Sequence, residues 1–339
     1  MRMSVNPRVN LQFLILFLAL ALGGSNAAHA GKPYQYYVVG TPVDVARPAP
    51  QRPSLVLIGA GPDVEGAFKW MIQKSGGGNF VVIRAAGTDA YNAYIYAMGG
   101  MASVETIIIP SRDAANDPFV KSRISAASAL FIAGGDQSDY ANYWQGTLVQ
   151  SAIQDLAGRN IPIGGISAGL AVMGEYAFMA SNGSVGSATV LSNPYDASVT
   201  LRRDFLAMPD MKGLITETHL DARNRMGRLM AFMARIVNDG WSDTARGIGV
   251  DVETALLVDD GIASLLGSGS AYFLQTDGVP EVCKPNTPLT YGNFDVQRLS
   301  GTGTFDLRNW ASHGAGTTQY SVSAIDGVAY STQASGAMY

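Results

Sequence analysis

The stretch Ile161–Met173, IPIGGISAGLAVM, contains the turn around which the rest of the chain is organised. An apolar run stops at a pair of glycines, Ser167 follows, and a helical pattern rich in alanine then resumes. The five residues centred on Ser167 satisfy G-x-S-x-G, the pattern of a nucleophile elbow. A buried strand that becomes a helix within about two residues strains the backbone at the turn, and only small neighbours such as Gly165, Ala168 and Gly169 tolerate this.

Ser167 has two interpretations at this stage. In the first, the turn lifts its hydroxyl clear of the sheet and places it at the positive end of a helix, where backbone N–H groups stabilise an oxyanion. In the second, the segment is a glycine-rich turn and Ser167 only caps the helix.

Working outward, short apolar runs alternate with amphipathic stretches. Such runs are typical of parallel strands covered on both faces, and the alternation predicts an α/β fold with a doubly wound, mostly parallel sheet. The expected strands are Ser54–Ala60, Asn79–Arg84, Glu105–Pro110, Ala129–Ala133, Ile161–Ile166, Gly213–Thr216 and Gly247–Val250. The expected helices are Val64–Gln73, Thr147–Ala157 and Ala222–Val237.

The texture changes after Val258, where short alternating runs are separated by Gly, Ser, Thr and Asn. This pattern predicts β-hairpins packed on the main domain. We therefore expect an α/β catalytic domain over residues 31–260 and a C-terminal β-rich region over residues 261–339. Ala311–Thr318 and the last ten residues look loosely ordered.

The first 30 residues have the pattern of a signal peptide. Arg2 and Arg8 precede an apolar run that is too short to span a bilayer, and Ala28-His29-Ala30 provides an A-x-A cleavage site. We expect cleavage after Ala30 and a secreted or periplasmic protein. Losing two arginines and no acids takes the formal net charge from −4 to −6, so neither nucleic acid nor an anionic membrane is an expected partner.

Metal ligands are scarce in the sequence. The only histidines are His29, His219 and His313, and His29 leaves with the signal peptide. No H-x-x-x-H or C-x-x-C spacing occurs, and Cys283 is the only cysteine. We expect neither a metal nor a cofactor.

A serine nucleophile needs a base, and His219 follows a predicted strand, which puts it at the carboxyl edge of the sheet together with Ser167. Arg223, Arg225 and Arg228 come shortly after it, near the expected start of a helix, where positive charge is unfavourable. This placement indicates an anionic ligand. The alternative is that these arginines pair with surface carboxylates or extend their charged ends to solvent along the surface.

A second turn, Gly134-Gly135-Asp136-Gln137, follows the predicted strand Ala129–Ala133 and converges on the same edge. The N–H groups of Gly135 and Ala168 are candidates for an oxyanion hole, and Gln137 for holding the substrate backbone. The alternative is a turn with a helix cap.

Taken together, these motifs resemble the cyanophycinases and their relatives, the S51 serine peptidases that include aspartyl dipeptidase. The family elbow GGTSAGA-A-V-M is similar to GGISAGLAVM at 164–173, and its GGDQ matches 134–137. Its D-Q-H-F-x-x-R-x-R-x-G-R-L segment resembles ETHLDARNRMGRL at 217–229 without a gap. Its G-I-G-I-D-E-x-T-A-L is similar to GIGVDVETAL at 247–256.

The resemblance implies a flavodoxin-like fold of the class I glutamine amidotransferase type and a serine exopeptidase. It implies that Ser167 is the nucleophile and His219 the base, and that a glutamine and arginines bind an aspartate-rich substrate. The binding residues carried over in this way are Gln137, Glu217, Arg223, Arg225 and Arg228, of which Glu217 stands where the family has Asp.

The acid that orients the histidine is less well defined, because Val252 occupies the place of the family's acidic residue and Glu253 follows it. Glu253 is our expectation for this acid, with Glu217 and Glu175 as alternatives.

The expected activity is hydrolysis of cyanophycin (multi-L-arginyl-poly-L-aspartate) or β-aspartyl peptides through an acyl-enzyme, by a protein that can form a homodimer. Two other classes remain open. An esterase of the α/β-hydrolase type also uses G-x-S-x-G and a later histidine, but it does not explain the three arginines. A non-catalytic binding protein on the same scaffold would explain Val252.

Overall fold

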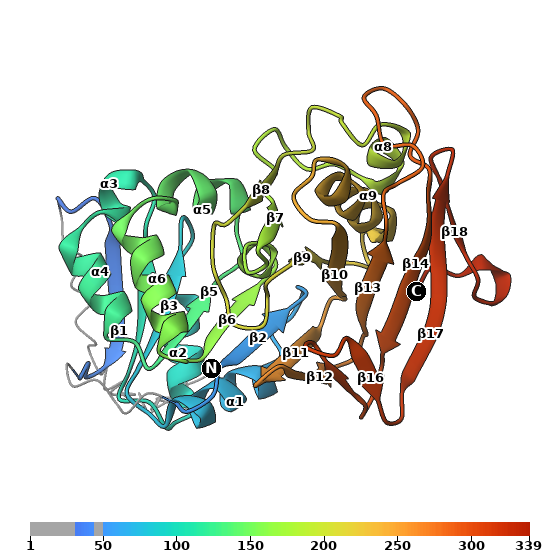
Figure 1. Cartoon of the computed structure of the whole chain (residues 1–339). Helices are drawn as coiled ribbons and strands as arrows, with labels where there is room; N and C mark the ends of the chain where they lie inside the picture. The colour runs from blue at the N-terminus through green and yellow to red at the C-terminus, as the bar shows by residue number, and fades with distance from the viewer. Residues whose placement is uncertain (1–30, 44–49) are drawn as a thin grey trace, which may run out of the picture.

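The computed structural model describes residues 31–43 and 50–339. In these residues the chain forms two mixed β-sheets (Figure 1). The predicted signal peptide lies outside the described residues. In the described part, no helix has the length and apolar character that crossing a bilayer requires.

The first sheet has ten strands in the order β1-β4-β3-β5-β6-β2-β11-β12-β15-β16. Its five central strands are parallel, and antiparallel strands extend it on both sides. The parallel strands are β2 (Ser54–Ile58), β3 (Asn79–Arg84), β4 (Ser103–Ile108), β5 (Ala129–Ile132) and β6 (Ile163–Ile166). The antiparallel strands are β1 (Gln35–Gly40), β11 (Thr254–Asp259), β12 (Ile262–Gly267), β15 (Thr304–Asp306) and β16 (Ala311–His313).

The second sheet has eight strands in the order β18-β17-β14-β13-β10-β9-β7-β8, and only the pairs β10–β9 and β9–β7 are parallel. Its strands are β7 (Tyr176–Phe178), β8 (Leu201–Arg203), β9 (Leu214–Thr218), β10 (Thr244–Val250), β13 (Ala271–Asp277), β14 (Tyr291–Leu299), β17 (Thr317–Ile325) and β18 (Val328–Ser331).

The expected α/β class is therefore correct, but a single, mostly parallel sheet is not what forms. The apolar runs near residues 214 and 247 belong to the second sheet rather than to the first. The predicted C-terminal hairpins extend both sheets, and strands on either side of residue 260 are hydrogen-bonded to each other, as β11 is to β12 and β10 to β13. The division of the chain at residue 260 stays a prediction.

Three buried apolar layers hold the two sheets and the helices together. One face of the first sheet packs on α1 and α2, and one face of the second packs on α8 and α9. The remaining faces share a central layer with α3 to α7, in which the rings of Phe273 (β13) and Phe305 (β15) stack 3.6 Å apart between centroids. The helices are α1 (Glu65–Ser75), α2 (Ala90–Ala97), α3 (Arg112–Ala115), α4 (Pro118–Ser125), α5 (Gln137–Trp144), α6 (Leu148–Gly158), α7 (Ala168–Ala171), α8 (Ser187–Ser192) and α9 (Met226–Asn238).

Two local expectations were wrong. The helix expected from Ala222 begins at Met226, because Asn224 has a φ of 47° and the residues before it form a compact turn. The segments expected to be loosely ordered instead contain β16, the start of β17, the second half of β18 and a 3₁₀ turn at Ala334–Gly336. Edge pairing to β15 and β17 supplies the order that local composition did not indicate.

Candidate active site

Ser167 occupies a strained turn between β6 and α7, with φ 52° and ψ −113°. Small neighbours are required there: a Cβ on Gly165 would lie 2.6 Å from the carbonyl carbon of Gly169, and one on Gly169 would lie 2.0 Å from the oxygen of Ile132. The predicted elbow conformation is confirmed. The alternative of a capping serine is wrong, because the Ser167 side chain makes no cap hydrogen bond to α7.

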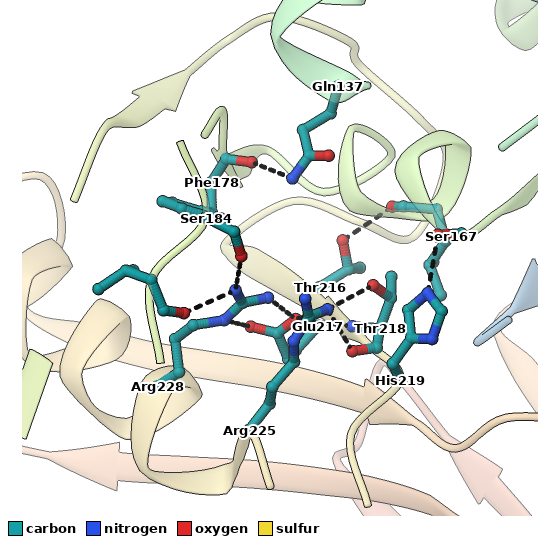
Figure 2. Close-up of polar contacts among 12 residues, drawn as sticks. Gln137, Ser167, Phe178, Ser184, Thr216, Glu217, Thr218, His219, Arg225 and Arg228 are labelled. Carbon is teal, nitrogen blue, oxygen red and sulfur yellow. Dashed lines mark hydrogen bonds and ion pairs between the residues drawn. The ribbon is translucent and has the colours of Figure 1, made fainter. Parts of the chain in front are cut away.

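The hydroxyl of Ser167 faces His219 instead. Ser167 Oγ lies 3.0 Å from His219 Nε2, within hydrogen-bond distance (Figure 2). His219 follows β9 and therefore belongs to the second sheet, so the expectation that both residues lie at the edge of one sheet was wrong. The two sheets meet at α7, where the Thr216 hydroxyl donates to the carbonyl of Leu170 at 2.9 Å. A serine and a base in contact can act as nucleophile and proton acceptor.

The imidazole of His219 is held neutral by its surroundings. Burial and, to a smaller extent, the guanidinium groups of Arg223 and Arg225 lower its pKa from 6.5 to about 4, while Glu217 opposes this shift. Only the neutral imidazole accepts a proton, so this environment keeps the base competent in mildly acidic solution.

If His219 is the base, kcat/KM is expected to fall with an apparent pKa of about 4 as the pH drops, because protonation then removes the acceptor. The measurement is a pH–rate profile, with circular dichroism at each pH to separate this loss from acid unfolding. An acid limb centred near 6.5 in folded protein would contradict the assignment.

The two glycine-containing turns meet at one cavity of about 280 Å³. A Cβ on Gly134 would lie 3.7 Å from the Cβ of Ser167, so the second turn lies directly beside the elbow. Gly135 and Ala168 both line the cavity, as their expected role in an oxyanion hole requires. Asp136 accepts from the N–H of Ser138 and caps α5, so the turn also has the alternative role considered for it. The lining comprises Gly135, Asp136, Gln137, Ser167, Ala168, Ala180, Gly183, Ser184, Thr218, His219, Arg223 and Arg225.

The three arginines have different environments. Arg228 is buried, does not line the cavity, and donates from Nε and a terminal nitrogen to the Glu217 carboxylate at 2.7 and 2.5 Å (Figure 2). Arg225 also lines the cavity. One of its terminal nitrogens donates hydrogen bonds to the Thr218 carbonyl, at 2.9 Å, and to the Glu217 carboxylate, at 3.4 Å. Arg223 lines the cavity, and within residues 31–43 and 50–339 its guanidinium has no hydrogen bond or ion pair.

Arg228 and, in part, Arg225 thus pair with a carboxylate, but it is the buried Glu217 and not a surface carboxylate as the alternative had it. Glu217 is only 3 % exposed and serves as their counter-ion, so the structure does not bring it or Arg228 to the cavity wall as substrate contacts. Gln137 does reach the wall, where its amide nitrogen donates to the carbonyl of Phe178 at 3.4 Å.

No carboxylate in the described ranges bonds to His219. The exposed side chain of Glu253 lies 3.5 Å from the hydroxyl of Ser268, and Glu217 is committed to the arginines. Glu175 accepts from the N–H of Gly213, before β9 begins and therefore at the opposite end of the strand from His219. The structure therefore brings Ser167 and His219 together without any of the three acids considered.

One wall of the cavity consists of residues that no sequence motif predicted. Ala180, Gly183 and Ser184 belong to the segment after β7, which has no recognisable catalytic pattern. The available signal was position, because β7 runs parallel to β9 and its carboxyl end therefore points toward His219. Among the residues described, no group of three or more His, Cys, Asp or Glu is arranged to hold a metal ion.

A serine in a strained strand-to-helix turn, in contact with a histidine beside an arginine-lined cavity, defines a candidate hydrolase site. The model of peptidase family S51 matches residues 82–266, and the chain belongs to that family. Membership supports a peptidase, and hence hydrolase, activity.

Curated relatives agree with this assignment. The chain is 30 % identical over 219 residues to a cyanophycinase from Nostoc sp. and 29 % identical over 219 residues to one from Trichormus variabilis; each match covers 63 % of this chain and 68 % of the relative. Among solved structures, a peptidase from an acI-B1 Actinobacterium aligns with a TM-score of 0.47 at 17 % identity, covering 68 % of this chain and 96 % of the other.

Proposed function

We propose that this chain is an exported serine exopeptidase that hydrolyses cyanophycin or related β-aspartyl peptides through an acyl-enzyme. The observation that carries the proposal is the 3.0 Å contact between Ser167 Oγ and His219 Nε2 at a cavity that also contains the Arg223 guanidinium, which has no partner among the described residues. Family membership supports it independently.

In the proposed reaction, Ser167 Oγ adds to the scissile carbonyl while its proton passes to His219 Nε2. The N–H groups of Gly135 and Ala168 stabilise the oxyanion. His219 then donates that proton to the leaving amine as the C–N bond breaks. Water, deprotonated by His219, hydrolyses the ester and frees Ser167.

Charge and size favour a short acidic substrate. The Arg223 guanidinium supplies a planar, paired set of donors for a carboxylate, and Arg225 adds a second positive charge at the same wall. A cavity of about 280 Å³ is at the small end for ligand sites and suits a chain end better than the middle of a polymer. In cyanophycin, where arginine is joined to each β-carboxyl of a polyaspartate backbone, cleavage from the end releases β-Asp-Arg.

The direct test is incubation of the purified mature protein with cyanophycin, with β-Asp-Arg and α-Asp dipeptides, and with a neutral ester, followed by mass analysis of the products. Release of β-Asp-Arg from the polymer, absent in Ser167→Ala, is the expected result. Hydrolysis of the ester alone would favour an esterase, and binding without turnover would favour a non-catalytic scaffold. Export is tested separately by N-terminal sequencing, which should begin at Gly31. The homodimer stays a prediction.

Arg223→Gln is expected to lower kcat/KM on an aspartyl substrate by about ten- to a hundred-fold, the range for losing charged hydrogen bonds, and to change hydrolysis of the neutral ester little. Arg52→Gln, which changes a side chain 72 % exposed outside the cavity lining, is the control. Equal losses on both substrates would contradict a carboxylate-binding role.

A further inference from the structure

The amino end of α9 is capped by residues from two distant parts of the chain. Arg225 occupies the N-cap position but makes no side-chain cap hydrogen bond, because its guanidinium is directed to Thr218 and Glu217. The first N–H groups of a helix have no partners within the helix and need others. Here the N–H of Met226 donates to the Tyr339 hydroxyl at 3.1 Å, and that of Arg228 donates to the Ser187 hydroxyl at 3.1 Å.

Both hydroxyls also hold Asn224, the residue between the two cavity arginines. Tyr339 donates to the side-chain oxygen of Asn224 at 3.0 Å, and Ser187 donates to its carbonyl at 2.5 Å. Asn224 has a φ of 47°, a conformation that needs support from its surroundings. Because Asn224 links Arg223 to Arg225, its backbone conformation sets the course of the chain from which both side chains extend.

The two capping residues are themselves firmly placed. The ring of Tyr339 packs edge-on against Tyr272 of β13, and the Tyr320 hydroxyl of β17 donates to the carbonyl of Met338 at 2.8 Å. Burial raises the pKa of Tyr339 to about 12, so its hydroxyl stays protonated and able to donate. On the other side, Gly227 allows α8 to approach: a Cβ there would lie 3.1 Å from the Cβ of Ser187.

We propose that Tyr339 and Ser187 are positioning residues that fix the Arg223–Arg225 turn against the cavity and so set its affinity for acidic substrates. This inference rests on the proposed function. On this proposal the segment after β18 and the start of α8 together determine substrate recognition, although Tyr339 and Ser187 are not among the residues that line the cavity.

The test compares Tyr339→Phe, which keeps the ring, and Ser187→Ala with two matched controls, Tyr330→Phe on β18 and Ser192→Ala on α8, whose side chains are exposed. Each capping variant loses the hydroxyl that both caps α9 and holds Asn224, and is expected to raise KM for a β-aspartyl dipeptide about five-fold, with kcat and the KM for a neutral ester unchanged. Ser187→Thr, which keeps a hydroxyl, should restore the KM.

Hydrogen exchange of residues 219–228 provides a second measurement that needs no substrate. Faster exchange there in the capping variants, but not in the controls, is the expected result. Unchanged exchange, or an equal rise in KM for the acidic and neutral substrates, would overturn the inference. If the wild type hydrolyses neither substrate, the proposed function fails and calorimetric binding of succinate decides the inference: weaker binding by Tyr339→Phe supports it, and equal or undetectable binding overturns it.

Discussion

Ser167→Ala is expected to lower kcat on any hydrolysed substrate by about 10⁵- to 10⁶-fold, since loss of a nucleophile removes the covalent route entirely. His219→Ala should cost nearly as much. The double variant should cost no more than either single one, because a nucleophile and its base act as one unit. Steady-state kinetics of the three variants, with Ser192→Ala as the control, measures this. Strict additivity of the two losses would rule out a functional pair.

Thermal unfolding of the three variants shows whether a loss of activity is instead caused by a loss of the fold. The Ser167 hydroxyl caps no helix, so Ser167→Ala should unfold near the wild-type temperature. A variant that had lost its fold would also be inactive, and that outcome would say nothing about nucleophilic catalysis.

The second large effect concerns stability. Glu217→Ala is expected to lower the free energy of unfolding by about 3–5 kcal/mol, because it leaves the positive charges of Arg225 and Arg228 buried without their counter-ion. The measurement is chemical denaturation at neutral pH.

A matched control exists on the surface. Glu65 forms an ion pair with Lys69 on α1, with both side chains more than half exposed, so Glu65→Ala should cost about 0.5 kcal/mol or less. The double variant Glu217→Ala/Arg228→Met should recover part of the loss, because it removes one of the stranded charges. A loss for Glu217→Ala as small as that for Glu65→Ala would contradict the internal ion-pair role.

Local pattern was sufficient to predict the five parallel strands of the first sheet. β3 spans the residues expected for it, and the glycines around Ser167 gave the correct backbone conformation, because steric demands at such a turn are local. Local sequence pattern could not predict that the strands divide into two sheets. The apolar run of β9 looks the same whether it pairs with β6 or, as it does, with β10 and β7.

For the site, too, the sequence predicted some features and missed others. Ser167, His219, Gly135 and Gln137 meet at one cavity, but His219 reaches it from the second sheet and not from the edge of the sheet that holds Ser167. The roles of the charged residues depend on distances that spacing does not encode. Arg223 and Arg228 look equivalent in the sequence, yet one has no partner among the described residues while the other is neutralised by Glu217. The acid expected near His219 failed to appear there for the same reason.

Ser167 follows a strand of the first sheet and His219 follows a strand of the second. Their contact therefore depends on how the two sheets pack against each other. The distance between them therefore depends on the contacts between the two sheets, among them the Thr216–Leu170 hydrogen bond and the stacked rings of Phe273 and Phe305. Dense interiors transmit small shifts, and a displacement of about 1 Å at reacting groups can cost about a hundred-fold in rate. A small shift of one sheet relative to the other is therefore expected to lower kcat, even while the hydrogen bonds within each sheet remain intact.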